Sequence, residues 1–125
     1  MRDFAIHVTD RPGEIARVAN ALARKDVNIK SMAGMNFQHQ GIMRVIADDV
    51  EATRTALREN NIRFEECELA TVLLENRAGE LALIADKLSN AGVNVNAMYV
   101  IGLDGDLVEL AFSVDDPKKA KKALE

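Results

Sequence analysis

The stretch DRPGEIARVANALARKDVNI, residues 10–29, returns later in the chain as NRAGELALIADKLSNAGVNV, residues 76–95. An offset of 66 residues aligns the two copies without a gap. Between residues 10 and 32, nine of the 23 positions are identical: Arg, Gly, Glu, two Ala, Leu, Val, Asn and Met. Self-similarity at a fixed spacing is the mark of a structural unit that is built more than once. The chain is therefore an internal duplication.

Each copy carries the apolar spacing of a helix that lies on a core. Four apolar side chains follow the i, i+3, i+4, i+7 pattern in the first copy, and the second copy repeats them position for position. The positions are Ile15, Val18, Ala19 and Leu22, followed by Leu81, Ile84, Ala85 and Leu88. We expect both stripes to be buried.

Strand-like segments surround each of these helices. In the first copy, residues 3–9 alternate in polarity, residues 27–37 follow the helix, and Met43, Val45 and Ala47 alternate inward after a turn. The inward positions of the second copy are Leu110, Phe112 and Val114. A second helix and a fourth strand complete the first copy, which gives the order strand, helix, strand, strand, helix, strand.

We therefore predict an α+β protein with two ferredoxin-like βαββαβ units in tandem, at residues 1–67 and 68–125. The sheets should be antiparallel, with helices on one face. The second unit is expected to lack its last strand, because the sequence ends within its second helix. Residues 62–74 contain no Gly or Pro. The last strand of the first unit and the first strand of the second are therefore expected to form one long strand or a barely bent one. Because the missing fourth strand would lie beside the first, we expect a free edge at residues 71–74.

Composition and charge weigh against several classes of function. Of the 125 residues, 48% are hydrophobic and 29% charged, which is typical of a globular protein. A net charge of −4 and only 4% aromatic residues weigh against nucleic acid as a partner. The single cysteine, Cys67, allows no disulfide within one chain and suits a reducing compartment. No signal segment or membrane-spanning run occurs, so we expect a cytoplasmic protein without a membrane partner.

No pattern in the sequence indicates catalysis. The two histidines, His7 and His39, have unrelated surroundings, and no Cys/His or paired-carboxylate spacing predicts a metal site. Neither a phosphate-binding glycine loop nor a nucleophile motif is present. The repeated Asp-Asp pairs are explained by helix caps, at Asp49 and Asp116. We therefore expect no enzyme, no catalytic residue, no metal and no cofactor.

The loops before the two repeated helices, residues 10–13 and 76–79, are the first candidate for a binding site. A structural interpretation is that the leading Asp or Asn caps the helix, Pro12 fixes its first turn and the following Glu favours the helix dipole. That interpretation leaves Gly13 and Gly79 unexplained, because Gly has no propensity advantage there. Gly lets a ligand approach the backbone closely, and the free N–H groups of a helix start attract anions.

Asn28 and Asn94 are the second candidate. An Asn at the entry of a strand is often only a turn or cap residue. Its recurrence beside a recurring Gly favours a shared role, since an amide can donate to a carboxylate and accept from an ammonium. Those two abilities suit an amino acid.

These motifs resemble the ACT domain, a small regulatory module that binds amino acids, and the duplication is similar to the stand-alone tandem ACT-domain proteins. The resemblance covers nearly the whole chain. It implies that a ligand lies where two ACT units meet side by side, between the first strand-to-helix loop of one and the start of the second strand of the other. The site residues implied by position are Asp10, Arg11, Pro12, Gly13, Asn28, Ile29, Asn76, Arg77, Ala78, Gly79, Asn94 and Val95.

The two sites are expected to be unequal, because one of them departs from the family pattern. Serine-sensing members carry an Asn in the loop and an Asn in the strand, and Asn76, Asn94 and Asn28 fit that pattern. Asp10 departs from it. An acidic Asp10 would repel the carboxylate of a ligand and attract its ammonium group.

Two functions follow as hypotheses. In the first, the chain is an allosteric regulatory protein that senses a small amino acid at the interface between ACT units. It then signals through self-association, as a homodimer, or through a regulated enzyme of amino-acid metabolism. In the second, the chain is an assembly module that forms homo-oligomers through its sheet edges and needs no ligand.

Overall fold

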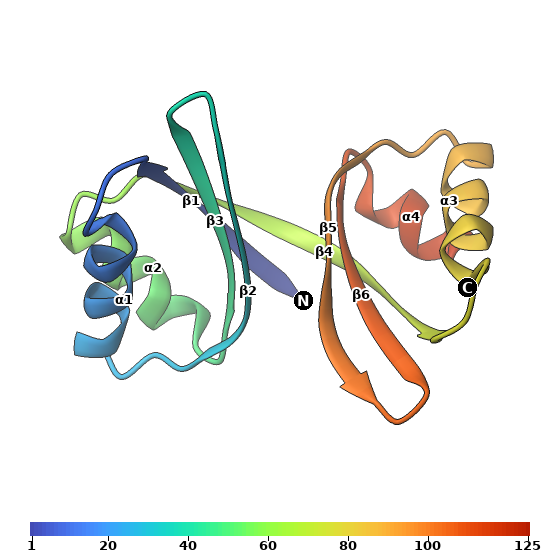
Figure 1. The fold of residues 1–125 in the computed structure, drawn as a ribbon, viewed down its shortest axis with the longest axis horizontal. Coiled ribbons are helices and arrows are strands. Elements are labelled where there is room, and N and C mark those ends of the chain that lie inside the picture. The colour runs from blue at the N-terminus through green and yellow to red at the C-terminus, as the bar shows by residue number, and fades with distance from the viewer. The chain divides into compact units, whose positions relative to one another are not determined.

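The computed structural model describes residues 1–125 and divides the chain into two compact units. One unit comprises Arg2–Cys67, and the other comprises Glu68–Glu125 together with Met1. In each unit the helices lie on one face of an antiparallel sheet (Figure 1). The predicted tandem ferredoxin-like fold is confirmed. The assignment of residues 1–67 and 68–125 as two separate ACT domains stays a prediction.

The first unit contains the full set of predicted elements. In chain order these are β1 (Arg2–Thr9), α1 (Glu14–Arg24), β2 (Ile29–Phe37), β3 (Gln40–Ala47), α2 (Val50–Glu59) and the beginning of β4 (Phe64–Glu75). The strand order is β2-β3-β1-β4. The backbone N–H of His7 in β1 donates to the carbonyl of Arg63 at 2.9 Å. Arg63 directly precedes β4, so this bond holds the beginning of β4 beside β1.

The second unit repeats this order without a last strand. It contains the rest of β4, α3 (Glu80–Asn90), β5 (Val95–Asp104), β6 (Leu107–Val114) and α4 (Pro117–Ala123). Its strand order is β4-β6-β5. No strand follows α4, as predicted. Within this unit, Thr71–Leu74 pair with β6 along one edge, and no other strand of the unit lies along the second edge.

Strand β4 belongs to both units. It runs for 12 residues without a break, as the absence of Gly and Pro predicts. The boundary between the units lies inside it, between Cys67 and Glu68. The two units are therefore joined by a strand and not by a linker.

Each unit has its own core of aliphatic side chains and phenylalanine. The predicted inward positions of β3 and β6 are buried, except Ala47, which is half-buried against the first core. The largest fully buried side chains of the first core include Phe4, Ile6, Leu22 and Leu57, and those of the second include Phe112 and Leu88. The alternation read from the sequence therefore assigns the correct face of each sheet.

The prediction that both helix stripes are wholly buried is wrong. Ile15 is 61% exposed and Leu81 is 48% exposed, and Ala85 is also on the surface. Because α1 packs on α2 as well as on the sheet, its buried side passes through Glu14, Val18, Ala21 and Leu22. The apolar stripe is therefore exposed at one of its four positions in α1 and at two of its four positions in α3.

Candidate functional site

The two predicted loops have the same backbone. Helix α1 begins at Glu14 and α3 at Glu80, and the residues before them, Gly13 and Gly79, are the N-caps with φ of 91° in both. A positive φ of this size favours glycine. A Cβ at either position would have no neighbour within 4 Å. The glycines are therefore needed for the conformation, and the space beside them is open.

Neither Asp10 nor Asn76 caps its helix, so the structural interpretation of these two residues is wrong. No side chain caps α1 or α3. Each of the two residues lies three positions before the N-cap glycine, whereas a capping side chain belongs to the N-cap residue itself. The side chains of Asp49 and Asp116 do cap α2 and α4, as predicted, by accepting from the N–H groups of Ala52 and Lys119.

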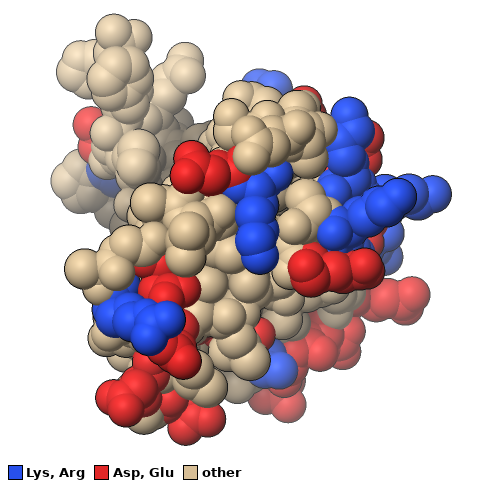
Figure 2. Space-filling model, turned by 90° about the vertical axis from the view of Figure 1, so that its right-hand side faces the viewer, with Lys and Arg blue, Asp and Glu red and all other residues tan.

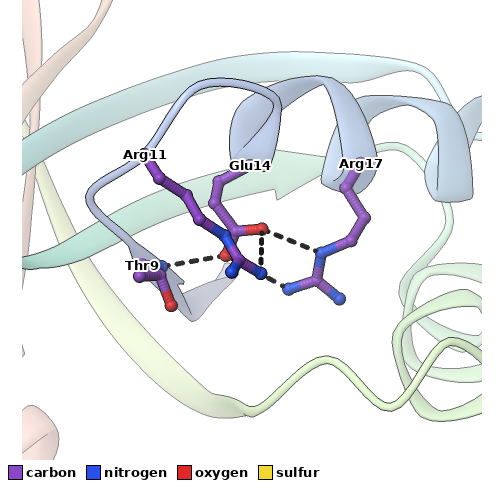
Figure 3. A network of polar contacts seen from close by, with 4 residues as sticks. All are labelled: Thr9, Arg11, Glu14 and Arg17. Atoms are coloured by element: carbon purple, nitrogen blue, oxygen red, sulfur yellow. Dashed lines mark hydrogen bonds and ion pairs between the residues drawn. The ribbon is translucent and has the colours of Figure 1, made fainter.

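Glu14 holds the first loop in place (Figure 3). Its carboxylate is buried and accepts the backbone N–H of Thr9 at 3.0 Å. Arg17 donates to it through Nε at 3.3 Å, and Arg11 through Nη2 at 3.5 Å. The Thr9 N–H and the two guanidinium groups lower the pKa of Glu14 below its ordinary value of 4.5, against the opposing effect of burial.

The second loop is held differently. Arg77 donates through Nε to Glu80 at 2.6 Å and pairs through Nη1 with Glu75 at 2.7 Å. Its hydrogen bond to Glu80 is the main reason that the pKa of Arg77 is raised. No backbone N–H donates to Glu80. The second loop is therefore held by ion pairs from the exposed Arg77, whereas the first is held by the buried carboxylate of Glu14.

The two Asn positions are fixed by a pair of aspartates that the sequence analysis did not select for this role. The backbone N–H of Asn28 donates to Asp48 Oδ1, and that of Asn94 to Asp115 Oδ1, both at 3.0 Å. The Asn28 side chain is exposed. The Asn94 amide donates to Asn96 Oδ1 at 3.0 Å. The repetition of Asp48 and Asp115 at an offset of 67 was the available signal for this bond.

No single unit brings its own loop and its own Asn together. The loop precedes α1 and Asn28 follows it, and α3 separates Asn76–Gly79 from Asn94 in the same way. Each helix has 11 residues, which corresponds to about 16 Å. The neighbouring Ile29 and Val95 are half-buried and pack against the two cores. Arg11, Pro12 and Ala78 are exposed.

A hollow of about 370 Å³ lies beside Asn94 in the second unit. It is lined mainly by apolar side chains from α3 and β5, among them Leu81, Ala85, Val95 and Met98. The outward half of the α3 stripe therefore forms one wall of a pocket that also contains a predicted site residue. Figure 2 shows that uncharged side chains cover much of the middle of the molecular face on the α3 and α4 side.

The structure contains no group of three or more His, Cys, Asp or Glu side chains that could hold a metal ion. None of its helices is both long enough and apolar enough to span a bilayer.

Comparison with protein families matches residues 1–124 to the model described as an ACT domain pair. The chain belongs to this family. A search of curated protein sequences finds no significant match.

The fold of this ACT domain pair occurs in several crystal structures. A protein from Bacteroides thetaiotaomicron aligns with a TM-score of 0.86 and 21% identity, over 98% of this chain and 85% of that one. The ligand-free regulatory subunit of aspartate kinase from Thermus thermophilus aligns with a TM-score of 0.64 and 16% identity, over 98% and 88%. Aspartokinase III of E. coli, crystallised with aspartate and ADP, aligns with a TM-score of 0.59 and 16% identity, over 99% of this chain and 30% of that one. At these identities the likeness concerns the fold alone.

Proposed function

We propose that this ACT domain pair is a regulatory protein that binds a small amino acid and has no catalytic activity of its own. The observation that carries the proposal is the repeated helix start in a chain of the ACT domain pair family. Both N-cap glycines have φ of 91°, and no side chain caps either helix. The N–H groups of Glu14 and Glu80 donate to the carbonyls of Arg11 and Arg77 at 3.5 Å, and the other first-turn N–H groups are available to a carboxylate.

The remaining site residues suit the other end of an amino acid. Asn28 and Asn94 offer amide oxygens to an ammonium group. Since a unit's own loop and Asn lie at opposite ends of its helix, a site that uses both takes them from two different ACT units. A ligand that binds both parts would favour the arrangement in which they meet, and so would act as a signal.

We propose two routes for that signal. One is a homodimer, for which the edge strand β5 of the second unit is suited. The other is a regulated enzyme of amino-acid metabolism. The regulatory subunit of aspartate kinase from Thermus thermophilus has the same fold, which makes that class of enzyme a reasonable first choice.

Calorimetric titration of the chain with each of the twenty amino acids tests the proposed function. We expect at least one to bind. Asn94→Ala should weaken binding about tenfold or more, because a hydrogen bond to a charged ligand group is lost. The matched control is Asn90→Ala, which removes an exposed amide at the end of α3 and should leave the affinity unchanged. No heat with any amino acid would refute the proposal.

The assembly module remains the second candidate, and β5 favours it. Strand β5 is the outer strand of its sheet. Its residues from Val95 to Leu103 carry no charge, whereas edge strands are commonly protected by charged side chains. This function predicts self-association that is the same with and without amino acids.

A further inference from the structure

The first loop carries a side-chain hydrogen bond that its copy lacks. Asn36 Nδ2, near the end of β2, donates to Asp10 Oδ1 at 2.7 Å. This bond ties the loop before α1 to the hairpin between β2 and β3. The backbone N–H of Asp10 also donates to the carbonyl of His39 in the same hairpin, at 3.4 Å.

The hairpin is shaped to hold Asn36 in this position. Gly41 lies opposite Asn36 in the pairing of β2 with β3. A Cβ on Gly41 would collide with Asn36 Oδ1 and with the Val8 side chain. The absence of a side chain at Gly41 therefore makes room for the Asn36 amide. Asp10, Asn36 and Gly41 act as one group, which we name the clasp.

All three positions of the clasp are different in the second unit. Asp10 is replaced by Asn76, and Gly41 corresponds to Val108 at the offset of 67. The offset of 66 places Gly102 at the position of Asn36. The strand pairing places Leu103 there, because Leu103 lies opposite Val108 as Asn36 lies opposite Gly41. Neither of those side chains can donate a hydrogen bond.

The backbone of the second loop is nevertheless anchored like that of the first. The N–H of Asn76 donates to the carbonyl of Asp106 in its hairpin at 2.7 Å. The N-cap φ is 91° in both units. The side chain of Asn76 makes no hydrogen bond within the chain. The two loops therefore share a backbone conformation, and the clasp is the feature that separates them.

We propose that the clasp keeps a ligand carboxylate away from the first loop, so that the chain binds one amino acid, through the loop at Asn76–Gly79. This inference rests on the proposed function. The clasp occupies Asp10 with Asn36 and holds a negative charge close to the start of α1, where it repels a ligand carboxylate. The second loop has a neutral amide in the same place, and its side chain is free to turn toward a ligand.

Amide hydrogen exchange in the ligand-free chain tests the clasp directly. The N–H groups of Arg11 and Arg77 are matched reporters, because each donates to the carbonyl two residues earlier at 2.9 Å. In Asn36→Leu, which copies Leu103, exchange at Arg11 should become about fivefold faster. Exchange at Arg77 should not change. An unchanged rate at Arg11 would overturn the clasp.

Calorimetric stoichiometry with the twenty amino acids, titrated singly, tests the consequence for binding. The wild-type chain should bind one molecule per chain, and the double variant Asp10→Asn with Asn36→Leu should bind two. Two molecules per wild-type chain would overturn the exclusion of the ligand from the first loop and leave the proposed function intact. No binding in either protein would refute the proposed function and the single open loop, while the exchange rates at Arg11 still decide whether the clasp exists.

Discussion

Glu14 and Glu80 occupy the same position of the repeat but make different bonds. Glu14 is buried and accepts a backbone N–H and two guanidinium groups. Glu80 accepts from Arg77, whose side chain is 67% exposed. Because the exposed ion pair is screened by water, we expect the first carboxylate to matter more for stability than the second.

The pH dependence of this difference follows from the lowered pKa of Glu14. A carboxyl group whose pKa is lower in the folded chain stabilises it fully above the ordinary value of 4.5, and that contribution is lost as the pH falls through the lowered value. Glu14→Gln should therefore lower the urea midpoint at pH 7, and its difference from wild type should shrink toward pH 3. Glu80→Gln is the control and should have the smaller effect at pH 7. A difference for Glu14→Gln that stays constant from pH 7 to pH 3 would contradict this assignment.

Helices α1 and α3 each present an apolar residue to solvent at the first position of the stripe and bury the last. Ile15 and Leu81 are exposed, whereas Leu22 and Leu88 are at most 2% exposed. The same helix surface therefore serves two purposes, a core on one side and an open apolar wall on the other. In the second unit that wall lines the hollow beside Asn94.

Alanine substitutions should separate the two halves of the stripe. Leu22→Ala and Leu88→Ala remove buried side chains and should each lower the free energy of unfolding by about 2–5 kcal/mol. Ile15→Ala and Leu81→Ala should change it by less than about 0.5 kcal/mol. Urea unfolding of the four variants measures this. Equal losses for Ile15→Ala and Leu22→Ala, or for Leu81→Ala and Leu88→Ala, would show that the exposed residue of that helix is buried in solution.

Periodicity was sufficient to predict the elements but not the rotation of α1. The spacing of Val18 and Leu22 fixed a helix, and the repeat fixed its copy. Whether Ile15 or Ala21 is buried depends on how α1 packs on α2, which local spacing does not contain. The repeat also drew attention to Gly13 and Gly79. Their left-handed conformation at the N-cap depends on how the loop enters the helix, which the repeat alone does not predict.

The bonds between distant residues were equally out of reach of local patterns. Asp48 lies 20 residues from Asn28, and Asn36 lies 26 from Asp10. In the sequence, Asp48 and Asn36 are only polar residues near the ends of strands, and nothing local identifies their partners. The comparison of the two copies is what gives these bonds meaning: Asp48 recurs as Asp115, whereas Asn36 has no polar counterpart.

At the scale of the whole molecule, β5 is the surface that we expect to pair with a second copy. Its regular segment, Ala97–Val100, lies between two irregularities in its pairing with β6. Met98 and Val100 are 44% and 49% exposed. The chain carries a net charge of −4, but residues 95–103 of β5 carry none. Two copies of β5 that pair about a twofold axis therefore bring no like charges into contact. In β2, by contrast, Lys30 places a charge along the edge.

Light scattering and sedimentation velocity should show a homodimer for the wild type and a monomer for Val100→Lys. The added charge would have to be buried at the interface. The matched control is Leu83→Lys on α3, which adds the same charge at a position 58% exposed and outside the β5 edge. A monomeric wild type, or a dimer that persists in Val100→Lys, would contradict this interface.

The continuity of β4 has a consequence for whether the two units can be separated by recombination. The boundary between the two compact units, between Cys67 and Glu68, lies inside strand β4. A recombination event at that point would leave two fragments, each with a shortened strand and unpaired backbone groups at a new edge. The pair is therefore the smallest part of the chain that keeps β4 whole.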